Sequence, residues 1–217
     1  MESLETLWPA YGLRLTTPRL VLRPIRDDDI PAFVEAAASG IYENRDGHIP
    51  FPADWAHAPD MASNSARWIW EHRIQASPSS WVIMFGVSTR DGEFLGSQDV
   101  AAKDFPALRT ISTGSWLRRS AQGQGLGKEM RAAVLVWAFD HLGADLAMTS
   151  TYDWNSPSIG VSSALGYEPN GEGRLKNSLG VVEREVRYRL PKERFRRPDW
   201  ELEVEGHEAA AAFLGVR

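Results

Sequence analysis

Apolar and polar residues alternate in short segments of the chain, and a period of two is typical of half-buried β-strands. In residues 17–25, Leu20 and Leu22 fall on one face while Val21 and Arg23 fall on the other, which predicts a strand. We expect further strands over residues 80–89, 93–105, 109–118, 144–152 and 181–190.

Other segments repeat apolar residues at helical spacing. Leu126, Met130, Val134 and Trp137 share one face of a predicted helix over residues 125–142. Further helices are expected over residues 27–39, 65–76 and 156–166. Between the first two of these, residues 40–62 carry three prolines without a clear period, and predict a long loop of the kind that is functional or mobile.

The order of the elements predicts the fold class. One strand and two helices precede a meander of three strands, and helix, strand, helix and strand follow. A meander that feeds a βαβ crossover gives an α/β (mixed α+β) fold with a mixed sheet, rather than a doubly wound parallel one. We expect one domain over residues 1–190 and a C-terminal extension, residues 191–217, packed on the same domain.

Composition narrows the classes of function. The chain has 24 basic and 29 acidic residues and a net charge of −5, which argues against a nucleic-acid partner. It has no cysteine, so it cannot use a thiolate nucleophile or a cysteine-bound zinc, and its five histidines show no metal spacing. No secretory signal is evident and no apolar run approaches the roughly 20 residues that span a bilayer, so we expect a cytoplasmic protein without a membrane partner.

The stretch "SAQGQGLGK", residues 120–128, brings three glycines together between a predicted strand and a predicted helix. Such a loop lets backbone N–H groups converge on a phosphate at a helix N-terminus. A Walker A loop would need a hydroxyl residue after Lys128, where the chain has Glu129. A dinucleotide fingerprint would need G-x-x-G spacing after the first strand of a βαβ unit, and neither is present.

The third pattern fits the context. Gln122, Gly123, Gln124, Gly125, Leu126 and Gly127 form Q-x-x-G-x-G, which resembles the acyl-CoA motif of the GNAT superfamily of N-acetyltransferases. The segments "TPRLVLRPIRDDD" and "NSPSIGVSSALGY" are similar to the Rim-type branch, which includes ribosomal-protein N-acetyltransferases. Within that branch, "AAKDFPALRTISTGSWL" and "EMRAAVL" resemble mycobacterial proteins labelled succinyl-CoA transferases. The likeness covers residues 14–190.

The resemblance implies a central, mostly antiparallel sheet with helices on both faces and two neighbouring strands that splay apart to hold the donor. It implies acetyl-CoA or succinyl-CoA as the acyl donor, no metal, and a homodimer. Arg118 and Arg119 could meet the 3′-phosphate of coenzyme A. The implied donor-binding residues are Ser115, Trp116, Leu117, Arg118, Gln122, Gly123, Gln124, Gly125, Leu126, Gly127, Lys128, Asn155 and Ser158.

Acyl transfer to an amine also needs a proton donor for the departing thiolate and a base for the amine. The resemblance points to Ser158 as the donor and to Asn155 beside it, although Asn155 is equally a natural helix cap. Tyr152 and Tyr167 are alternatives for the proton donor. Many relatives place a glutamate on the strand that corresponds to residues 109–118, and this chain has none there. The candidates for the base are Asp104, Asp99, Asp153, Glu185 and a bound water.

Two classes of function remain open. The first is an N-acyltransferase that moves an acetyl or succinyl group directly to a primary amine, on a protein N-terminus or a small molecule. The second is a non-catalytic acyl-CoA-binding or regulatory module with the same fold. The long loop over residues 40–62 lies where the family builds acceptor specificity, and its aromatic and acidic residues could recognise a cationic amine.

Overall fold

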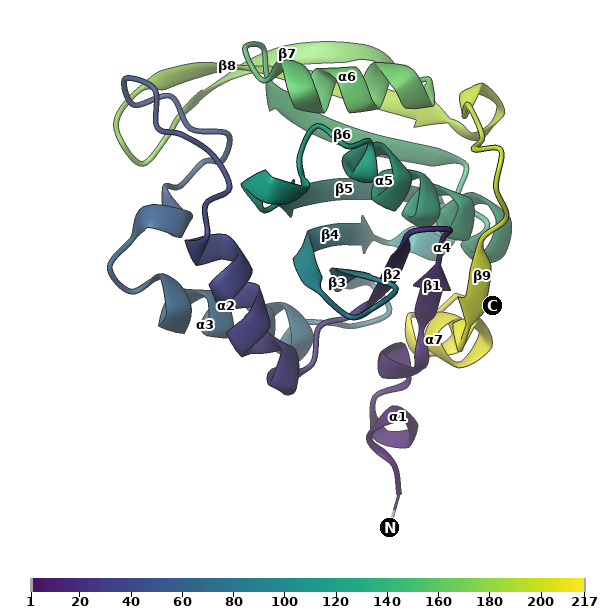
Figure 1. Ribbon diagram of the computed structural model, residues 1–217. Coiled ribbons are helices and arrows are strands. Elements are labelled where there is room, and N and C mark those ends of the chain that lie inside the picture. Colours follow the sequence, from purple (N-terminus) through teal and green to yellow (C-terminus); the bar gives the residue numbers. More distant parts are fainter. Residues whose placement is uncertain (1, 217) are drawn as a thin grey trace.

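The protein is built on a single sheet of nine strands in the order β7-β8-β6-β5-β4-β3-β2-β1-β9 (Figure 1). The computed structural model describes residues 2–216. All neighbouring strands are antiparallel except β5 and β6, which are parallel. The strands are β1 (Arg14–Thr16), β2 (Leu20–Pro24), β3 (Ser80–Thr89), β4 (Phe94–Lys103), β5 (Thr110–Leu117), β6 (Leu146–Tyr152), β7 (Glu168–Lys176), β8 (Val182–Pro191) and β9 (Glu203–Glu205).

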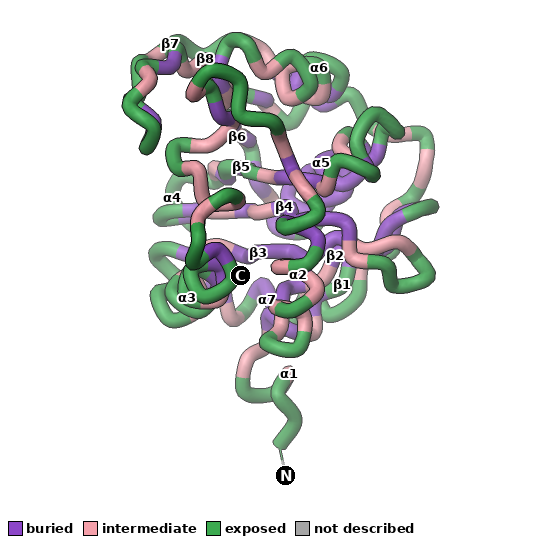
Figure 2. The backbone as a smooth tube through the Cα atoms, turned by 60° about the vertical axis from the view of Figure 1, so that its left-hand side comes forward, coloured by how far each residue is buried: buried purple, intermediate pink, exposed green. Residues whose placement is uncertain are grey.

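Helices cover both faces of the sheet and bury two apolar clusters (Figures 1 and 2). The larger cluster lies under α5 and includes Trp137, Phe85 and Ile111, all fully buried. The smaller one lies on the opposite face under α2 and α3 and includes Phe33 and Trp116. The α-helices are α1 (Leu4–Leu7), α2 (Ile30–Ala38), α3 (Met61–Ile74), α4 (Phe105–Leu108), α5 (Leu126–Val136), α6 (Ser156–Leu165) and α7 (His207–Phe213), and Trp137–Leu142 continues α5 as a π-helix.

The predicted fold class and its mostly antiparallel sheet are confirmed. The predicted strand over residues 80–89 is β3, and a tight turn at Asp91-Gly92 joins it to β4. Gly92 has a φ of +93°, the left-handed backbone that such turns require. The predicted helix over residues 65–76 begins earlier, at Met61, so the long loop is shorter than expected.

Strand β7 is the longest of the strands that the sequence analysis did not predict. Every residue of β7 is exposed or half-buried, so its sequence has no apolar alternation to mark it. It forms because it pairs with β8 along nearly its whole length, from Glu168↔Arg189 to Lys176↔Val182. Pairing with a neighbour, rather than burial of its own side chains, defines this strand.

The C-terminal residues close the other edge of the sheet. Strand β9 pairs antiparallel with β1, and α7 packs against the main core through Ala210 and Leu214, both fully or almost fully buried. Trp8 stacks on Phe213 with ring centroids 4.6 Å apart, which joins the N-terminal segment to α7. Residues 191–216 therefore share the core of the preceding domain.

Candidate functional site

The sheet opens between β5 and β6. Their parallel pairing covers only Thr110↔Leu146, Ile111↔Ala147 and Ser112↔Met148. Beyond these pairs, β5 stays on β4 up to Leu117 while β6 follows β8 up to Tyr152. The Thr149 hydroxyl donates to the Thr113 carbonyl at 3.0 Å and marks the closed end. Because alternate residues point their backbone groups to the same side, Ser115 presents its N–H and C=O groups to the opening and Leu117 presents its N–H, while the Leu117 carbonyl accepts from the Gln122 side chain.

The glycine loop lies directly after the open end of β5. Gly123 and Gly125 have φ angles of +74° and +78°, a backbone conformation that strains other residues. Gly125 is the N-cap of α5 and no side chain caps that end, so the first N–H groups of the helix are free to bind an anion. The loop predicted to hold phosphate thus has the geometry of an anion site.

Side chains hold this loop against the body of the protein. The amide nitrogen of Gln122 donates to the carbonyls of Leu117 and Ile41, at 2.7 and 2.8 Å. Arg19 donates to the Gln124 carbonyl at 3.0 Å. Gln122, predicted as a donor-binding residue, therefore acts here by shaping the loop, and Arg19 is a support that sequence reasoning missed.

Arg19 also neutralises a buried carboxylate on α5. The Glu129 side chain is 6% exposed, and its oxygens accept from Arg19 Nε and the Thr17 hydroxyl, both at 2.6 Å. A glutamate in the first turn of a helix looks ordinary in sequence, since helix N-termini favour acidic residues. Its partners lie more than 100 positions away, so no local pattern could have revealed the cluster.

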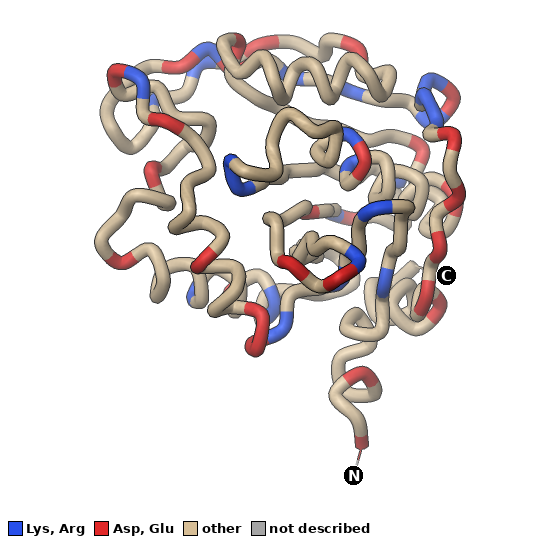
Figure 3. Tube along the Cα trace, viewed as in Figure 1, with Lys and Arg blue, Asp and Glu red and all other residues tan. Residues whose placement is uncertain are grey.

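Two arginines stand at the turn that follows β5. Figure 3 shows how basic and acidic residues are distributed along the chain. Arg118 pairs with Glu93, and Arg119 pairs with Glu43 at 2.6 Å. The Arg119 pair is about half exposed on both sides. The side chain of Lys128 is exposed, whereas that of Leu126 is buried and anchors the helix. The predicted Trp116 packs on the other face of the sheet, with its ring 4.9 Å from that of Phe33.

Helix α6 begins at the mouth of the opening, on the β6 side. Asn155 is its N-cap and accepts a hydrogen bond from the Ser158 backbone N–H at 3.4 Å, so the capping function is present. Ser158 is half-buried, and its carbonyl accepts from the Ser162 hydroxyl one turn later. Tyr152, at the end of β6, is buried and its hydroxyl has no hydrogen-bond partner among the described residues.

The candidates for the base separate in space. Asp99 pairs with Gly114 across β4 and β5, level with the opening, and burial raises its pKa to about 6. Because Gly114 has no side chain, the Asp99 carboxylate reaches the backbone of β5 at this point: a Cβ on Gly114 would lie 3.8 Å from Asp99 Oδ2. The Ser97 hydroxyl donates to Asp99 at 3.0 Å, and His72 of α3 lies near enough to lower the pKa slightly.

The structure does not bring Asp104 into the opening. It is exposed, precedes α4, and lies at the end of β4 that borders the closed end of the β5–β6 pair. Asp153 is exposed and 3.6 Å from Arg184, and Glu185 binds Arg187 at 2.6 Å. Of the carboxylates considered, Asp99 is the one that combines proximity to the opening with a pKa suited to accepting a proton near neutral pH.

The loop over residues 41–60 packs on the β7–β8 hairpin and forms a wall beside the opening (Figure 1). Asn177 donates to the Gly47 carbonyl at 2.8 Å, and Ser178 accepts from the Asp54 N–H at 2.9 Å. Inside the loop, Asp54 accepts from the Tyr42 hydroxyl at 2.7 Å and contacts His57 at 2.6 Å. Burial, reinforced by Asp54, raises the pKa of Tyr42.

A second anchor of this wall is a buried carboxylate. Glu183 is 1% exposed and accepts from Trp154 Nε1 at 2.8 Å and from Asn177 Nδ2 at 3.0 Å, and His48 Nδ1 lies 3.0 Å away. Its contacts join the loop, the hairpin and the segment before α6. This network fixes the wall beside the opening, and sequence reasoning did not anticipate it.

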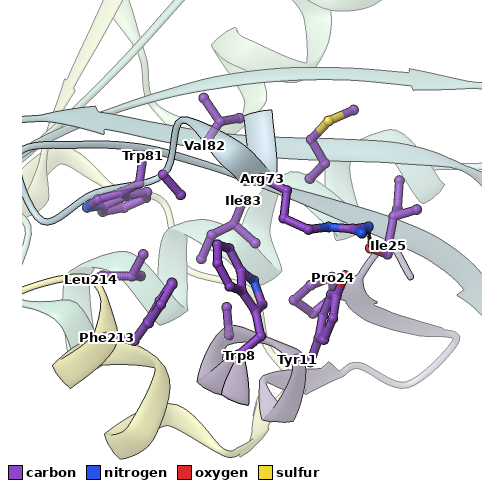
Figure 4. Close-up of a pocket in the computed structure, with 13 residues that line it drawn as sticks. Trp8, Tyr11, Pro24, Ile25, Arg73, Trp81, Val82, Ile83, Phe213 and Leu214 are labelled. Atoms are coloured by element: carbon purple, nitrogen blue, oxygen red, sulfur yellow. Dashed lines mark hydrogen bonds between the residues drawn. The ribbon is translucent and has the colours of Figure 1, made fainter. Parts of the chain in front are cut away.

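An apolar pocket lies elsewhere, between the N-terminal segment, β3 and α7 (Figure 4). Trp8, Tyr11, Ile83 and Phe213 line it, and its one charged residue, Arg73, donates to the Ile25 carbonyl at 3.2 Å. None of the predicted site residues borders this pocket. Within residues 2–216, no cluster of acidic and histidine side chains suits a metal ion, and no helix is long and apolar enough to cross a membrane.

Comparison with known proteins agrees with this geometry. A family model described as an acetyltransferase (GNAT) domain matches residues 19–168. An uncharacterized N-acetyltransferase of the SPbeta prophage of Bacillus subtilis, YokL, is 26% identical over 162 residues, which cover 73% of this chain and 81% of that protein.

Solved structures share the fold at low sequence identity. RimJ of Mycobacterium smegmatis, in complex with CoA-disulfide, superposes with a TM-score of 0.69 at 20% identity and covers 94% of this chain and 95% of its own. RimL, a ribosomal L7/L12 alpha-N-protein acetyltransferase in complex with coenzyme A, gives 0.65 at 16% identity and covers 80% and 94%. The ribosomal-protein-S5-alanine acetyltransferase of Vibrio fischeri gives 0.62 at 15% identity and covers 87% and 98%.

Proposed function

The chain belongs to the GNAT family of acetyltransferases, and we propose that it transfers an acyl group from a coenzyme A thioester to a primary amine by direct transfer in a ternary complex. The observation that carries this proposal is the uncapped, glycine-rich start of α5 placed at the open end of the unpaired backbone of β5. Without cysteine, the chain has no thiolate that could carry the acyl group.

The arrangement sets the direction in which the donor lies. Its pyrophosphate binds the free N–H groups around Gly125, where the positive end of the α5 dipole favours negative charge. The pantetheine arm then runs back along β5 and hydrogen-bonds, as an added strand does, to the Leu117 N–H and to the backbone of Ser115. The thioester comes to rest near the closed end, where Thr113 and Thr149 meet.

The chemical steps follow from the residues around the closed end of the opening between β5 and β6. The amine nitrogen attacks the thioester carbon and loses a proton to Asp99, directly or through a water. As the new C–N bond forms, a β5 backbone N–H near Ser115 stabilises the negative oxygen. The C–S bond then breaks, its electron pair passes to sulfur, and the Ser158 hydroxyl relays a proton from water to the thiolate, which becomes the free thiol.

The donor and acceptor classes rest on the family and its structural neighbours. The family description favours acetyl-CoA, with succinyl-CoA as a second donor to be assayed beside it. RimL, by its description, acetylates a protein N-terminus, and that fold neighbour favours an α-amine on a peptide over a sugar amine as the first acceptor to try. The acidic and aromatic side chains of residues 41–60 suit a cationic amine before it is deprotonated.

The test is thiol release from acetyl-CoA and succinyl-CoA across a panel of N-terminal peptides and small amines. We expect turnover with at least one pair, and stoichiometric loss of the free amine. Tight coenzyme A binding without turnover for any amine would favour the alternative, a non-catalytic acyl-CoA-binding module.

Two variants examine the assigned parts separately. Gly125→Val places a side chain in the phosphate site and should abolish donor binding, whereas Gly171→Val is a matched control with a φ of +94° and nothing within 4 Å of its Cβ position. Ser158→Ala should lower turnover more than donor affinity. Ser163→Ala, on an exposed position of the same helix, is its control. Unchanged affinity in the first or unchanged turnover in the second would remove that residue from its assigned role.

A further inference from the structure

Arg131 is a buried cation on the second turn of α5, on the side of the helix that packs against β5 and α6. It is 4% exposed. Its Nη2 donates to the Ser115 hydroxyl of β5 at 3.0 Å and its Nη1 donates to the Ser162 hydroxyl of α6 at 3.3 Å. Its Nε is buried and has no partner. The guanidinium therefore spans the space between β5 and α6 and rests on two neutral hydroxyls.

No carboxylate of residues 2–216 compensates this charge. Every other arginine of the described chain is either exposed or paired with an acidic side chain. Tyr167 lies near enough to act on this charge; its buried hydroxyl has no hydrogen-bond partner within residues 2–216, and burial raises its pKa. Burial lowers the pKa of Arg131 as well. An unpaired buried charge is costly, and the missing partner must be an anion that comes with the ligand.

The position of Arg131 shows which part of a donor it would meet. Gly127, one turn earlier, lies beside Leu117 of β5 and Val161 of α6: its Cβ position is 3.9 and 3.8 Å from these side chains. One helical turn carries Arg131 about 6 Å deeper. Ser115 lies a similar distance, about 7 Å, behind Leu117 along β5. Arg131 is thus level with the thioester end of the donor rather than with its phosphates.

We propose that Arg131, acting through the hydroxyl of Ser115, stabilises the thiolate of coenzyme A as the C–S bond breaks, while Ser162 holds the guanidinium in place. The proposal rests on the proposed acyl transfer. When that bond breaks, its electron pair leaves a full negative charge on sulfur inside the slot, where water screens it poorly. Arg131 is a positioning residue in this step: it holds positive charge and the Ser115 hydroxyl dipole near the sulfur, and Ser158 still delivers the proton.

The experiment is a titration of bound coenzyme A. The thiolate of bound coenzyme A is followed by its ultraviolet absorbance against pH in the wild type, Arg131→Met, Arg131→Lys and Arg174→Met. An opposite charge nearby lowers a pKa by about 1 to 3. We expect the thiol pKa to be lower by that amount in the wild type than in Arg131→Met. Arg131→Lys should recover part of the shift. Arg174, an exposed arginine of β7 with no ion pair, provides the control.

Turnover supplies the second measurement. Arg131→Met should lower kcat about 100-fold, and by the same factor with acetyl-CoA and succinyl-CoA. A loss confined to succinyl-CoA, with the thiol pKa unchanged, would overturn the proposal and make Arg131 the partner of the donor's own carboxylate. If Arg131→Met does not fold, Arg131→Lys is compared with the wild type instead. Lysine lacks the guanidinium geometry, so a thiol pKa and a kcat with both donors equal to those of the wild type would also contradict the proposal.

The outcome is separable from the proposed function. The thiol titration needs coenzyme A binding but no amine and no turnover. Normal binding with an unchanged thiol pKa in Arg131→Met overturns only the role of Arg131. Failure of the wild-type chain to bind coenzyme A at all overturns the proposed function, and with it the reason to place a thiolate beside Arg131.

Discussion

Glu129 and Arg131 lie two residues apart on α5 and both are buried, but their charges differ in whether an oppositely charged partner balances them. Glu129 is bound by the Arg19 guanidinium and the Thr17 hydroxyl, so its charge is balanced inside the chain. Arg131 is bound only by two serine hydroxyls, which leave its charge in place. The first arrangement serves the stability of the loop and helix. The second lowers stability for a site that an anion can complete.

The largest effect is expected when the balanced charge loses its partner. Arg19→Met leaves the Glu129 carboxylate buried without a cation and should lower the free energy of unfolding by about 3–5 kcal/mol. Urea unfolding at pH 7 measures this. The double variant Arg19→Met, Glu129→Met removes both charges and should recover much of the loss. A loss below about 1 kcal/mol in the single variant would mean that Glu129 does not depend on Arg19.

The contrast between these two charges also shows which features of the fold and the site can be predicted from the sequence. Alternation and helical spacing predicted most strands and helices because those residues face the two cores, and the glycines at 123, 125 and 127 pointed to the loop because few other functions require them so close together. The buried charges could not be found in this way. Glu129 and Arg131 look like ordinary helix residues, and their status depends on Arg19, Ser115 and Ser162, which the fold brings to them.

Asp99 provides a third charge, half-buried and intermediate between the two. Burial raises its pKa from 3.8 to about 6, so ionisation destabilises the folded state as the pH rises between these values. Asp99→Asn, which stays neutral, should therefore be more stable than the wild type above pH 6 by up to about 3 kcal/mol, with the gain vanishing near pH 4. Thermal unfolding from pH 4 to 8 checks the curve.

Turnover should respond in the opposite sense. The wild-type rate should fall as the pH drops through about 6, where Asp99 gains a proton, and Asp99→Asn should lose this limb together with most of its activity. Asp104→Asn is the matched control for the stability measurement on Asp99→Asn, because Asp104 is exposed. If Asp104→Asn lost turnover while Asp99→Asn kept it, the assignment of the base would be reversed.

Removal of the uncompensated charge should have a smaller effect, of opposite sign to that at Arg19. Arg131→Met replaces an unpaired buried guanidinium with an apolar side chain, so stability should stay level or rise by up to about 2 kcal/mol. Urea unfolding without coenzyme A measures it. A loss comparable to that of Arg19→Met would show that the serine hydroxyls balance Arg131 after all, and the contrast between the two charges would disappear.

The smallest change in stability is expected at the surface of the same loop. Arg119 and Glu43 form an ion pair that is about half exposed, and such pairs contribute between 0 and about 1 kcal/mol. Arg119→Met should therefore leave unfolding almost unchanged.

Its effect should appear in donor binding instead, if Arg119 exchanges Glu43 for the 3′-phosphate of coenzyme A. Affinity for coenzyme A should fall about tenfold in Arg119→Met, as the loss of one charge-assisted hydrogen bond implies, while affinity for 3′-dephospho-coenzyme A should not change. Titration calorimetry with both ligands separates the two. An equal loss for both would place Arg119 near the pyrophosphate rather than the 3′-phosphate. In that case Arg119, although exposed, would bind the middle of coenzyme A. Burial would then no longer distinguish the charges that act at the thioester end of the donor from those that bind its phosphates.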